Sequence, residues 1–229
     1  MFGRIAPRYD LLNRLLSLRI DQYWRRRLVR EVGNYLAEPS TCWMDLCCGT
    51  GDLLLALELE RNRLLGAAAK PGLGADFCRP MLARAKSKMR WRKLPSVLVE
   101  ADALAIPLPD ESLDLITIAW GFRNLANFQK GLQEANRLLR TNGCLAILEF
   151  SRPKNRIWGP LFEFYFRRIL PRLGNTISGS GHAYAYLQHS VREFLEPDQL
   201  ATQMRSFGFG RVEVHALTGG ISVLHLGYK

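Results

Sequence analysis

The fold is decided by one stretch of the chain, Cys42-Trp43-Met44-Asp45-Leu46-Cys47-Cys48-Gly49-Thr50-Gly51-Asp52. The apolar residues up to Leu46 suit a buried strand, and Asp52 stands where the next helix begins. Gly49 and Gly51 allow the backbone to turn sharply and to approach a ligand closely. A strand, a glycine-rich turn and a helix in this order predict a nucleotide-type pocket at the turn.

The spacing of glycines and acids narrows the choice of ligand. A dinucleotide site needs a third glycine three residues after Gly51, where this chain has Leu54, so NAD is disfavoured. The same pattern also serves S-adenosylmethionine (SAM), whose ribose hydroxyls need a carboxylate further along the chain. Asp76 ends a second apolar run about twenty-five residues after the turn, near the distance typical of a βαβ unit. A tight turn with a solvated acid is the simpler alternative. We expect SAM, bound by Asp45, Gly49, Gly51, Asp76 and Phe77.

The composition is typical of a folded protein, and the net charge favours anionic partners. The 229 residues, 48% of them hydrophobic, suffice for one domain with a sizeable core. The chain contains no apolar run of about eighteen residues and no signal-peptide pattern, so we expect a cytoplasmic protein, with peripheral membrane contact left open. Five cysteines without a C-x-x-C pair favour reduced thiols and no metal site. The net charge of +11 favours a phospholipid surface or nucleic acid, unless it is only a solvated basic face.

Strand and helix patterns alternate along the chain. Apolar runs predict five strands, at 42–46, 73–76, 96–100, 113–119 and 144–150, with helices between them at 53–65, 80–90 and 128–139. A last helix is expected at 197–207, followed by an antiparallel pair at 212–216 and 222–228. This order predicts an α/β, Rossmann-like fold with a mostly parallel seven-stranded sheet and helices on both faces. Ligands of such sheets bind outside the carboxyl ends of the strands.

Two segments do not follow this alternation of strands and helices. Residues 1–38 have the leucine spacing of helices, and residues 151–196 are aromatic and apolar, with an expected loop at 177–186. We interpret both as covers of a substrate pocket, although core packing also explains the leucines. We expect these two segments to form a single domain together with a SAM-binding core at 42–150 and the last helix and edge strands at 197–229.

Several short runs carry a family resemblance. They are Met1–Asn13, Asp45–Asp52, Ala101–Ala103, Gly121–Asn124, Leu148–Ser151, Ile177–Gly179, Ala183–Leu187 and Leu217–Ile221. In this order they resemble the ubiquinone and menaquinone biosynthesis C-methyltransferases, the UbiE/MenG family, over nearly the whole chain. The resemblance implies a class I SAM-dependent methyltransferase that methylates a ring carbon of a prenylated quinol.

The resemblance also implies roles for single residues around the cofactor. Thr50 and Asp76 match SAM-contacting positions, and Asp102 with Ala103 matches a position near the adenine. Ala119, at the end of the fourth strand, matches another, where relatives often have a serine. The side-chain hydroxyl of that serine is missing in this chain.

The chemistry of ring methylation suggests the catalytic residues. An aromatic carbon attacks a sulfonium methyl group when its quinol hydroxyl is deprotonated or nearly so. We expect Arg123 to stabilise the phenolate, since its high pKa makes it a poor base, and Asn124 to orient the ring or a water. Glu149 is expected to orient the backbone of the site. His182 and Tyr184 are further catalytic candidates, and the predicted substrate contacts are Tyr9, Leu16, Phe164 and Tyr186. Packing alone also explains each of these residues except Phe164.

The sequence leaves the ring and some partners open. We expect a naphthoquinol, as in menaquinone or phylloquinone biosynthesis, and keep a benzoquinol of the ubiquinone route as an alternative. An RNA methyltransferase lacks support because no base-flipping motif or RNA module is visible. A non-catalytic SAM-binding scaffold is disfavoured by the intact acids and Arg123. The expected partners are the quinol and an anionic membrane surface facing Arg25–Arg27 and Arg167–Arg168, with a homo-oligomer left open and no nucleic acid.

Overall fold

The computed structural model describes Asp10, Arg14 and residues 17–66, 70–154, 156–165, 168 and 182–229, the side chains at 182–185 and 187 excepted. The predicted contacts Tyr9 and Leu16 lie outside these residues.

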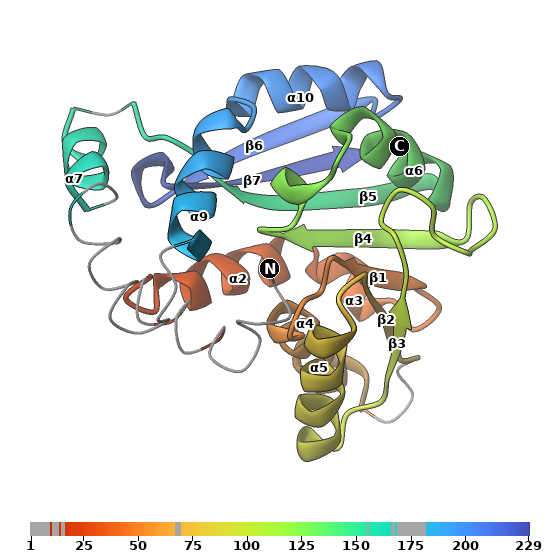
Figure 1. Cartoon of the computed structure of the whole chain (residues 1–229). Helices are drawn as coiled ribbons and strands as arrows, with labels where there is room; N and C mark the ends of the chain where they lie inside the picture. Colours follow the sequence, from red (N-terminus) through yellow and green to blue (C-terminus); the bar gives the residue numbers. More distant parts are fainter. Residues whose placement is uncertain are drawn as a thin grey trace.

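A seven-stranded sheet in the order β3-β2-β1-β4-β5-β7-β6 forms the centre of the molecule (Figure 1). The neighbours among β1 to β5 pair in parallel, and β7 pairs antiparallel with both β5 and β6. The predicted mostly parallel sheet with an antiparallel edge is therefore confirmed. The strands are β1 (Trp43–Leu46), β2 (Gly72–Asp76), β3 (Ser96–Glu100), β4 (Leu113–Ala119), β5 (Leu139–Phe150), β6 (Arg211–Leu217) and β7 (Ser222–Tyr228).

Helices cover both faces of the sheet. One face packs against α2 (Ile20–Glu31), α3 (Gly33–Ala37), α4 (Asp52–Leu65) and α5 (Arg79–Arg92). The other packs against α6 (Phe128–Leu138) and α10 (Pro197–Ser206). The alternation of side chains along each strand supplies both cores, since Trp43 faces the first set and Met44 the second. The short helices are η2 (Phe122–Asn124), α7 (Trp158–Phe164) and η4 (Thr218–Gly220), and α9 (His182–Glu193) precedes α10.

Two local predictions were wrong. The strand expected from residue 144 begins at Leu139, directly after α6, because Leu139 pairs with Leu113 of β4 and the backbone at Asn142 and Gly143 pairs with Lys229, directly after β7. Asn142 takes a left-handed conformation within this strand instead of ending a turn before it. The loop expected at 177–186 is helical from His182 onward, because the alanine and tyrosine residues after the glycines are compatible with the helix α9.

A buried arginine fixes the connection that leads into β1. The side chain of Arg61, on α4, is 0% exposed and its guanidinium donates to five backbone carbonyls. The acceptors are the carbonyls of Leu36, Glu38, Pro39, Thr41 and Lys70. Three of them, Glu38, Pro39 and Thr41, belong to the segment between α3 and β1, and Leu36 lies in α3 itself. Arg61 therefore supplies hydrogen bonds that this segment lacks within itself.

We expect Arg61→Met to lower the free energy of unfolding by about 3 kcal/mol, because the buried carbonyls lose their donors. Urea denaturation measures the change. The matched control is Arg63→Met on the same helix, where the guanidinium pairs with Glu60 in an exposed ion pair and the expected loss is below about 1 kcal/mol. Equal losses in the two variants would contradict the role given to Arg61.

Candidate active site

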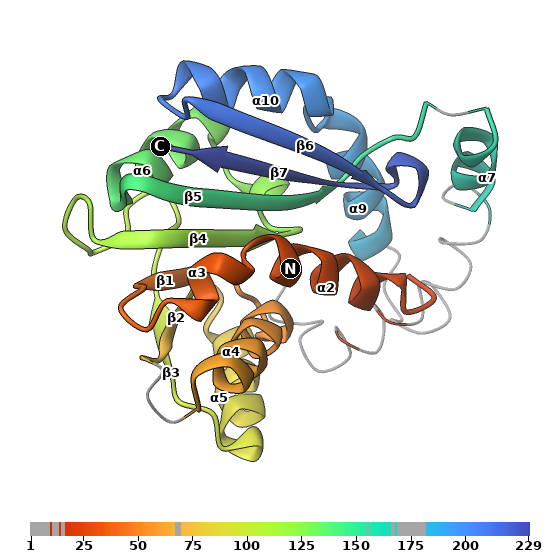
Figure 2. The same cartoon turned by 180° about the vertical axis from the view of Figure 1, so that it is seen from behind.

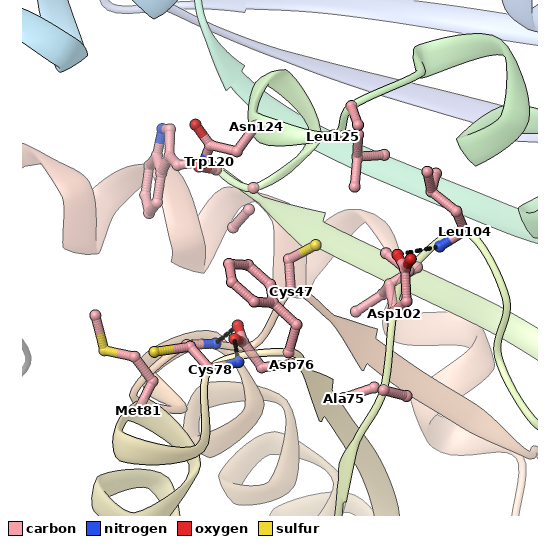
Figure 3. Close-up of a pocket in the computed structure, with 18 residues that line it drawn as sticks. Cys47, Ala75, Asp76, Cys78, Met81, Asp102, Leu104, Trp120, Asn124 and Leu125 are labelled. Atoms are coloured by element: carbon pink, nitrogen blue, oxygen red, sulfur yellow. Dashed lines mark hydrogen bonds between the residues drawn. The ribbon is translucent and has the colours of Figure 1, made fainter. Parts of the chain in front are cut away.

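A cavity of about 350 Å³ lies at the carboxyl ends of the strands (Figure 3). Four connections line it, and each follows a parallel strand. They contribute Leu46, Cys47 and Gly49 after β1, Ala75 to Cys78 with Met81 after β2, Ala101 to Leu104 after β3, and Ala119 to Gly121 with Asn124 to Ala126 after β4. The cavity therefore occupies the position that the parallel sheet predicts for a ligand.

The glycine-rich turn reverses the chain through left-handed backbone conformations. Cys47, Gly49 and Gly51 have φ values of 56°, 54° and 79°. A side chain at Gly51 would lie 2.9 Å from the Cβ of Ala85, so this glycine allows α5 to approach the start of α4. A Cβ at Gly49 would meet nothing within 4 Å, which leaves open space beside the backbone for a ligand.

Asp76 ties this turn to the neighbouring strand. Its carboxylate accepts hydrogen bonds from the backbone amides of Gly49 and Cys78, each at 2.8 Å. Burial raises the pKa of Asp76, and the two amides oppose that shift. The carboxylate lines the cavity beside Phe77, whose ring is largely exposed. Asp76 is therefore a fixed acceptor that suits the two hydroxyls of a ribose.

Asp102 lines the same cavity from the end of β3. Its carboxylate accepts a hydrogen bond from the amide of Leu104 at 2.9 Å, which fixes the turn that carries Ala103. Ala119, at the end of β4, lies on the cavity wall as well. The structure thus brings Gly49, Asp76, Asp102, Ala103 and Ala119 together around one space.

Asp45 lies beneath the turn. Its side chain is 1% exposed, it is not among the described residues that line the cavity, and it accepts a hydrogen bond from the hydroxyl of Thr117 at 2.8 Å. Burial raises the pKa of Asp45 to about 7. The carboxyl group lies between β1 and β4, so the geometry supports a role in holding the turn.

Thr50 faces away from the cavity, toward the N-terminal part of the chain. Its hydroxyl donates to Asp10 at 2.5 Å and accepts from the ammonium of Lys88 at 3.1 Å. Lys88 also pairs with Asp10 at 2.7 Å and with Asp52 at 2.5 Å. This network joins the N-terminal part of the chain, the glycine turn and α5.

The connection after β4 forms the opposite wall of the cavity. Gly121 passes so close to Cys47 that a side chain there would lie 2.4 Å from the Cβ of that cysteine. The preceding Trp120 lines the cavity and packs against Trp24 of α2, with ring centroids 6.0 Å apart. The sequence analysis did not predict Trp120 and Cys47 as residues of the site. Their positions directly after β4 and β1 could have indicated them, because ligands bind at the carboxyl ends of parallel strands.

Arg123 is held in a buried ion pair behind this wall. Its Nη1 donates to Glu149 Oε2 and to the carbonyl of Trp120, both at 2.7 Å. The backbone amide of Arg123 donates to the other carboxylate oxygen of Glu149 at 3.1 Å, which confirms that Glu149 orients the backbone of the site. Arg123 does not line the cavity among the described residues, and its Nε has no hydrogen-bond partner there.

Asn124 extends from the same short helix to the cavity. Its side-chain oxygen accepts from the hydroxyl of Tyr186 at 3.0 Å, and its amide donates to the carbonyl of Trp120 at 3.3 Å. The first bond connects η2 to α9, so two residues predicted separately from the sequence lie together. His182 and Tyr184 belong to the first turn of α9, and their side chains lie outside the described part.

Phe164, the remaining predicted substrate contact, lies on α7 with 59% of its surface exposed. It is not among the described residues that line the cavity. Any contact with a substrate at Phe164 would therefore involve a part of the molecule other than the cavity.

The sheet order and the cavity define the class I SAM-dependent methyltransferase fold, and solved structures agree. A SAM-dependent methyltransferase from Thermotoga maritima, described as a possible histamine N-methyltransferase, matches with a TM-score of 0.68 at 18% identity, covering 100% of this chain and 97% of that one. A SAM-dependent methyltransferase from Aquifex aeolicus matches with a TM-score of 0.60 at 18% identity, covering 87% of each chain. At these identities the likeness concerns the fold.

The ubiE/COQ5 methyltransferase family matches residues 1–229, and the chain belongs to that family. Among its relatives, a demethylmenaquinone methyltransferase of Thermus thermophilus is 46% identical over 227 residues, covering 99% of both chains. A demethylmenaquinone methyltransferase of Deinococcus radiodurans is 43% identical, covering 100% of this chain and 91% of the relative. A ubiquinone/menaquinone biosynthesis C-methyltransferase UbiE of a Geobacter species is 40% identical, covering 100% and 94%. The predicted family, enzyme class and SAM cofactor are confirmed.

The buried carboxyl group of Asp45 predicts a pH-dependent stability. Its pKa is about 7 in the folded protein and near 4 in the unfolded chain, so the folded state holds the proton more tightly. The resulting stabilisation is complete below about pH 4 and is lost as the pH rises through 7. Asp45→Asn stays neutral and its amide can donate to the Thr117 hydroxyl.

At pH 8 we expect the free energy of unfolding of Asp45→Asn to be higher than that of the wild type by on the order of 3 kcal/mol. This difference should shrink as the pH falls toward 4. Urea denaturation between pH 4.5 and 8 measures this difference. Asp110→Asn serves as the control, because its carboxylate is exposed and pairs with Arg137, and this variant should not gain stability at pH 8. A variant that is less stable than the wild type at pH 8 would contradict the assignment of a raised pKa to Asp45.

Proposed function

We propose that this enzyme transfers the methyl group of SAM to a ring carbon of a prenylated demethyl-naphthoquinol, in the biosynthesis of menaquinone or phylloquinone. The observation that carries the proposal is the cavity, where the acids Asp76 and Asp102 lie opposite Trp120 and Asn124. The names of the relatives at 46% and 43% identity support a naphthoquinol. A benzoquinol is the second candidate, supported by the printed name of the relative at 40%.

The residues around the cavity fit SAM. Asp76 would hold the ribose hydroxyls, Asp102 with Ala103 would lie near the adenine, and the backbone at Gly49 would meet the amino-acid end. The open space beside Gly49 and the fixed carboxylate of Asp76 are the observations that support this placement. When bound, SAM supplies an electrophilic methyl group on a sulfonium. In this proposal Thr50 acts from behind the turn, through its bonds to Asp10 and Lys88.

Asn124 and Tyr186 would form the substrate side of the site. Their hydrogen bond of 3.0 Å joins the phenol hydroxyl of Tyr186 to the side chain of Asn124, which lines the cavity. The pair would orient the ring and bind the quinol oxygen. Arg123 stands beside them with a charge that Glu149 fixes in place. Because the ion pair uses Nη1 and leaves Nε without a partner among the described residues, Arg123 can still stabilise a developing phenolate electrostatically.

A prenylated substrate also implies contact with a membrane. The quinol resides among lipids, and within the described residues no helix has the length and apolarity needed to cross a bilayer. We therefore include peripheral contact with an anionic membrane surface in the proposal, with the net charge of +11 as its support.

The test is methyl transfer from labelled SAM to a reduced, short-chain demethyl-naphthoquinol and to the matching benzoquinol. We expect at least tenfold faster turnover of the naphthoquinol. Arg123→Ala should lower kcat by roughly 100-fold with SAM binding retained, because a preorganised charge is lost. The control is Arg152→Ala, which removes an exposed guanidinium paired with Glu196 and should leave kcat unchanged.

Arg123→Ala leaves the buried Glu149 without its cation, so Arg123→Ala/Glu149→Gln separates a loss of charge from a loss of folding. Faster turnover of the benzoquinol would favour the second candidate. Failure of the folded, SAM-binding wild type to methylate either quinol would sink the proposed function.

A further inference from the structure

The short helix α7 presents apolar side chains to the outside of the molecule. Ile157, Leu161 and Phe164 are 75%, 54% and 59% exposed, although all three are large and hydrophobic. They follow the spacing i, i+4 and i+7, which places them on one face of a helix. Phe162 is 7% exposed. The helix therefore has apolar side chains on its outer side as well as on the side that packs against the protein.

Figures 1 and 2 show α7 standing away from the sheet, at the end of the molecule toward which β4 and β5 point. The cavity opens at the carboxyl ends of the strands, so α7 lies at the same end of the fold. The turn before α2 is at that end too, and it exposes Leu18 and Arg19.

Cations flank this apolar face along the chain. Lys154, Arg156 and Arg168 are all exposed, two before α7 and one after it. The ammonium of Lys154 lies 3.3 Å from Glu196, but its side chain is 81% exposed, so that pair neutralises it little. Apolar side chains on one face of a helix with exposed cations close to it in the sequence are typical of a segment that lies in the interface of an anionic bilayer.

The basic patch predicted at Arg25–Arg27 differs from α7, because two of its three cations pair with carboxylates of the protein. The side chain of Arg25 is buried in ion pairs with Asp21 and Asp52, and Arg27 pairs with Glu31 at 2.6 Å. Arg26 is exposed, so contact of this patch with a membrane stays a prediction, although carboxylates within one helical turn and from α4 pair with Arg25 and Arg27. Of the second predicted pair, Arg168 is exposed and Arg167 lies outside the described residues.

A second copy of the chain fits this face less well than lipid does. Three side chains on a seven-residue helix offer far less than the roughly 800 Å² that each partner of a stable complex buries. The net charge of +11 also opposes self-association and favours an anionic partner.

We propose that α7 is the membrane-docking element of this enzyme, with Ile157, Leu161 and Phe164 entering the boundary between head groups and acyl chains of an anionic bilayer. Arg156, Arg168 and Lys154 bind the lipid head groups around it. This inference rests on the proposed function, in which the substrate carries a prenyl chain. Docking of α7 would bring the end of the fold at which the cavity opens toward the bilayer.

The first test measures co-sedimentation with vesicles of phosphatidylcholine containing phosphatidylglycerol, and with pure phosphatidylcholine, at physiological salt. We expect binding only to the anionic vesicles. Ile157→Ser/Leu161→Ser should lower the partition coefficient at least tenfold, because two apolar side chains no longer leave water. The matched control is Trp91→Ser/Val97→Ser, which removes two apolar side chains of 76% and 47% exposure from α5 and β3 and should not change binding.

Charge reversal tests the second part of the surface. Arg156→Glu/Arg168→Glu should weaken binding to the anionic vesicles at least tenfold, while Lys86→Glu/Arg90→Glu on α5 changes the net charge equally and should weaken it much less. Equal effects of the two variants would overturn the assignment of α7 and indicate a response to net charge alone.

An activity assay separates this inference from the proposed function. Ile157→Ser/Leu161→Ser should methylate a short-chain quinol in solution at the wild-type rate but lose at least tenfold in rate with a long-chain quinol held in anionic vesicles. If the wild type methylates the short-chain quinol and the double variant matches it on vesicles, the docking surface is refuted while the function stands.

If size-exclusion chromatography shows a wild-type dimer that the double variant breaks, with vesicle binding unchanged, the face pairs two copies and the proposal is overturned.

Discussion

The hydrogen bond from the Gly49 amide to the Asp76 carboxylate is the constraint on which the site depends. It joins the carboxyl ends of β1 and β2, two strands that already pair in parallel, and it closes the floor of the cavity. The left-handed backbone at Gly49 and Gly51 makes this geometry available, and the contact of Gly51 with Ala85 makes it compact. Asp45 supports the same turn from below through Thr117. A ligand on this floor therefore meets a backbone that has little freedom to move.

The remaining walls are built from distant parts of the chain. Trp120 connects the cavity to α2 through Trp24, and the guanidinium of Arg25 lies 5.6 Å from the centre of the Trp120 ring. Glu149 reaches from β5 to fix both the amide and the side chain of Arg123. The N-terminal part of the chain, β4 and β5 thus share one wall of the site. Segments far from the glycine turn in the sequence therefore contribute directly to the shape of the site.

The sequence was sufficient for the sheet and for the residues at the strand ends, since apolar runs and their spacing are local signals. It was insufficient where a partner lies far along the chain. The early start of β5 depends in part on Lys229, nearly ninety residues after Asn142. No local sequence pattern predicts this pairing. Arg25 looked like a solvated charge because Asp52 approaches it only in the folded molecule. Arg123 was correctly placed after β4, but its pairing with Glu149 across the sheet redirects its side chain behind the wall.

The thiol of Cys47 bears on how the cavity reacts with an oxidised ring. Its thiol lines the space that would hold the reacting ring, and burial together with nearby carboxylates raises its pKa well above the usual range. A quinol that loses two electrons becomes an electrophile, which thiolates attack readily. Since the thiolate is the reactive form, a thiol that stays protonated at neutral pH adds slowly to such a ring. The same burial that shapes the wall thus disfavours the reactive form of this thiol beside the ring.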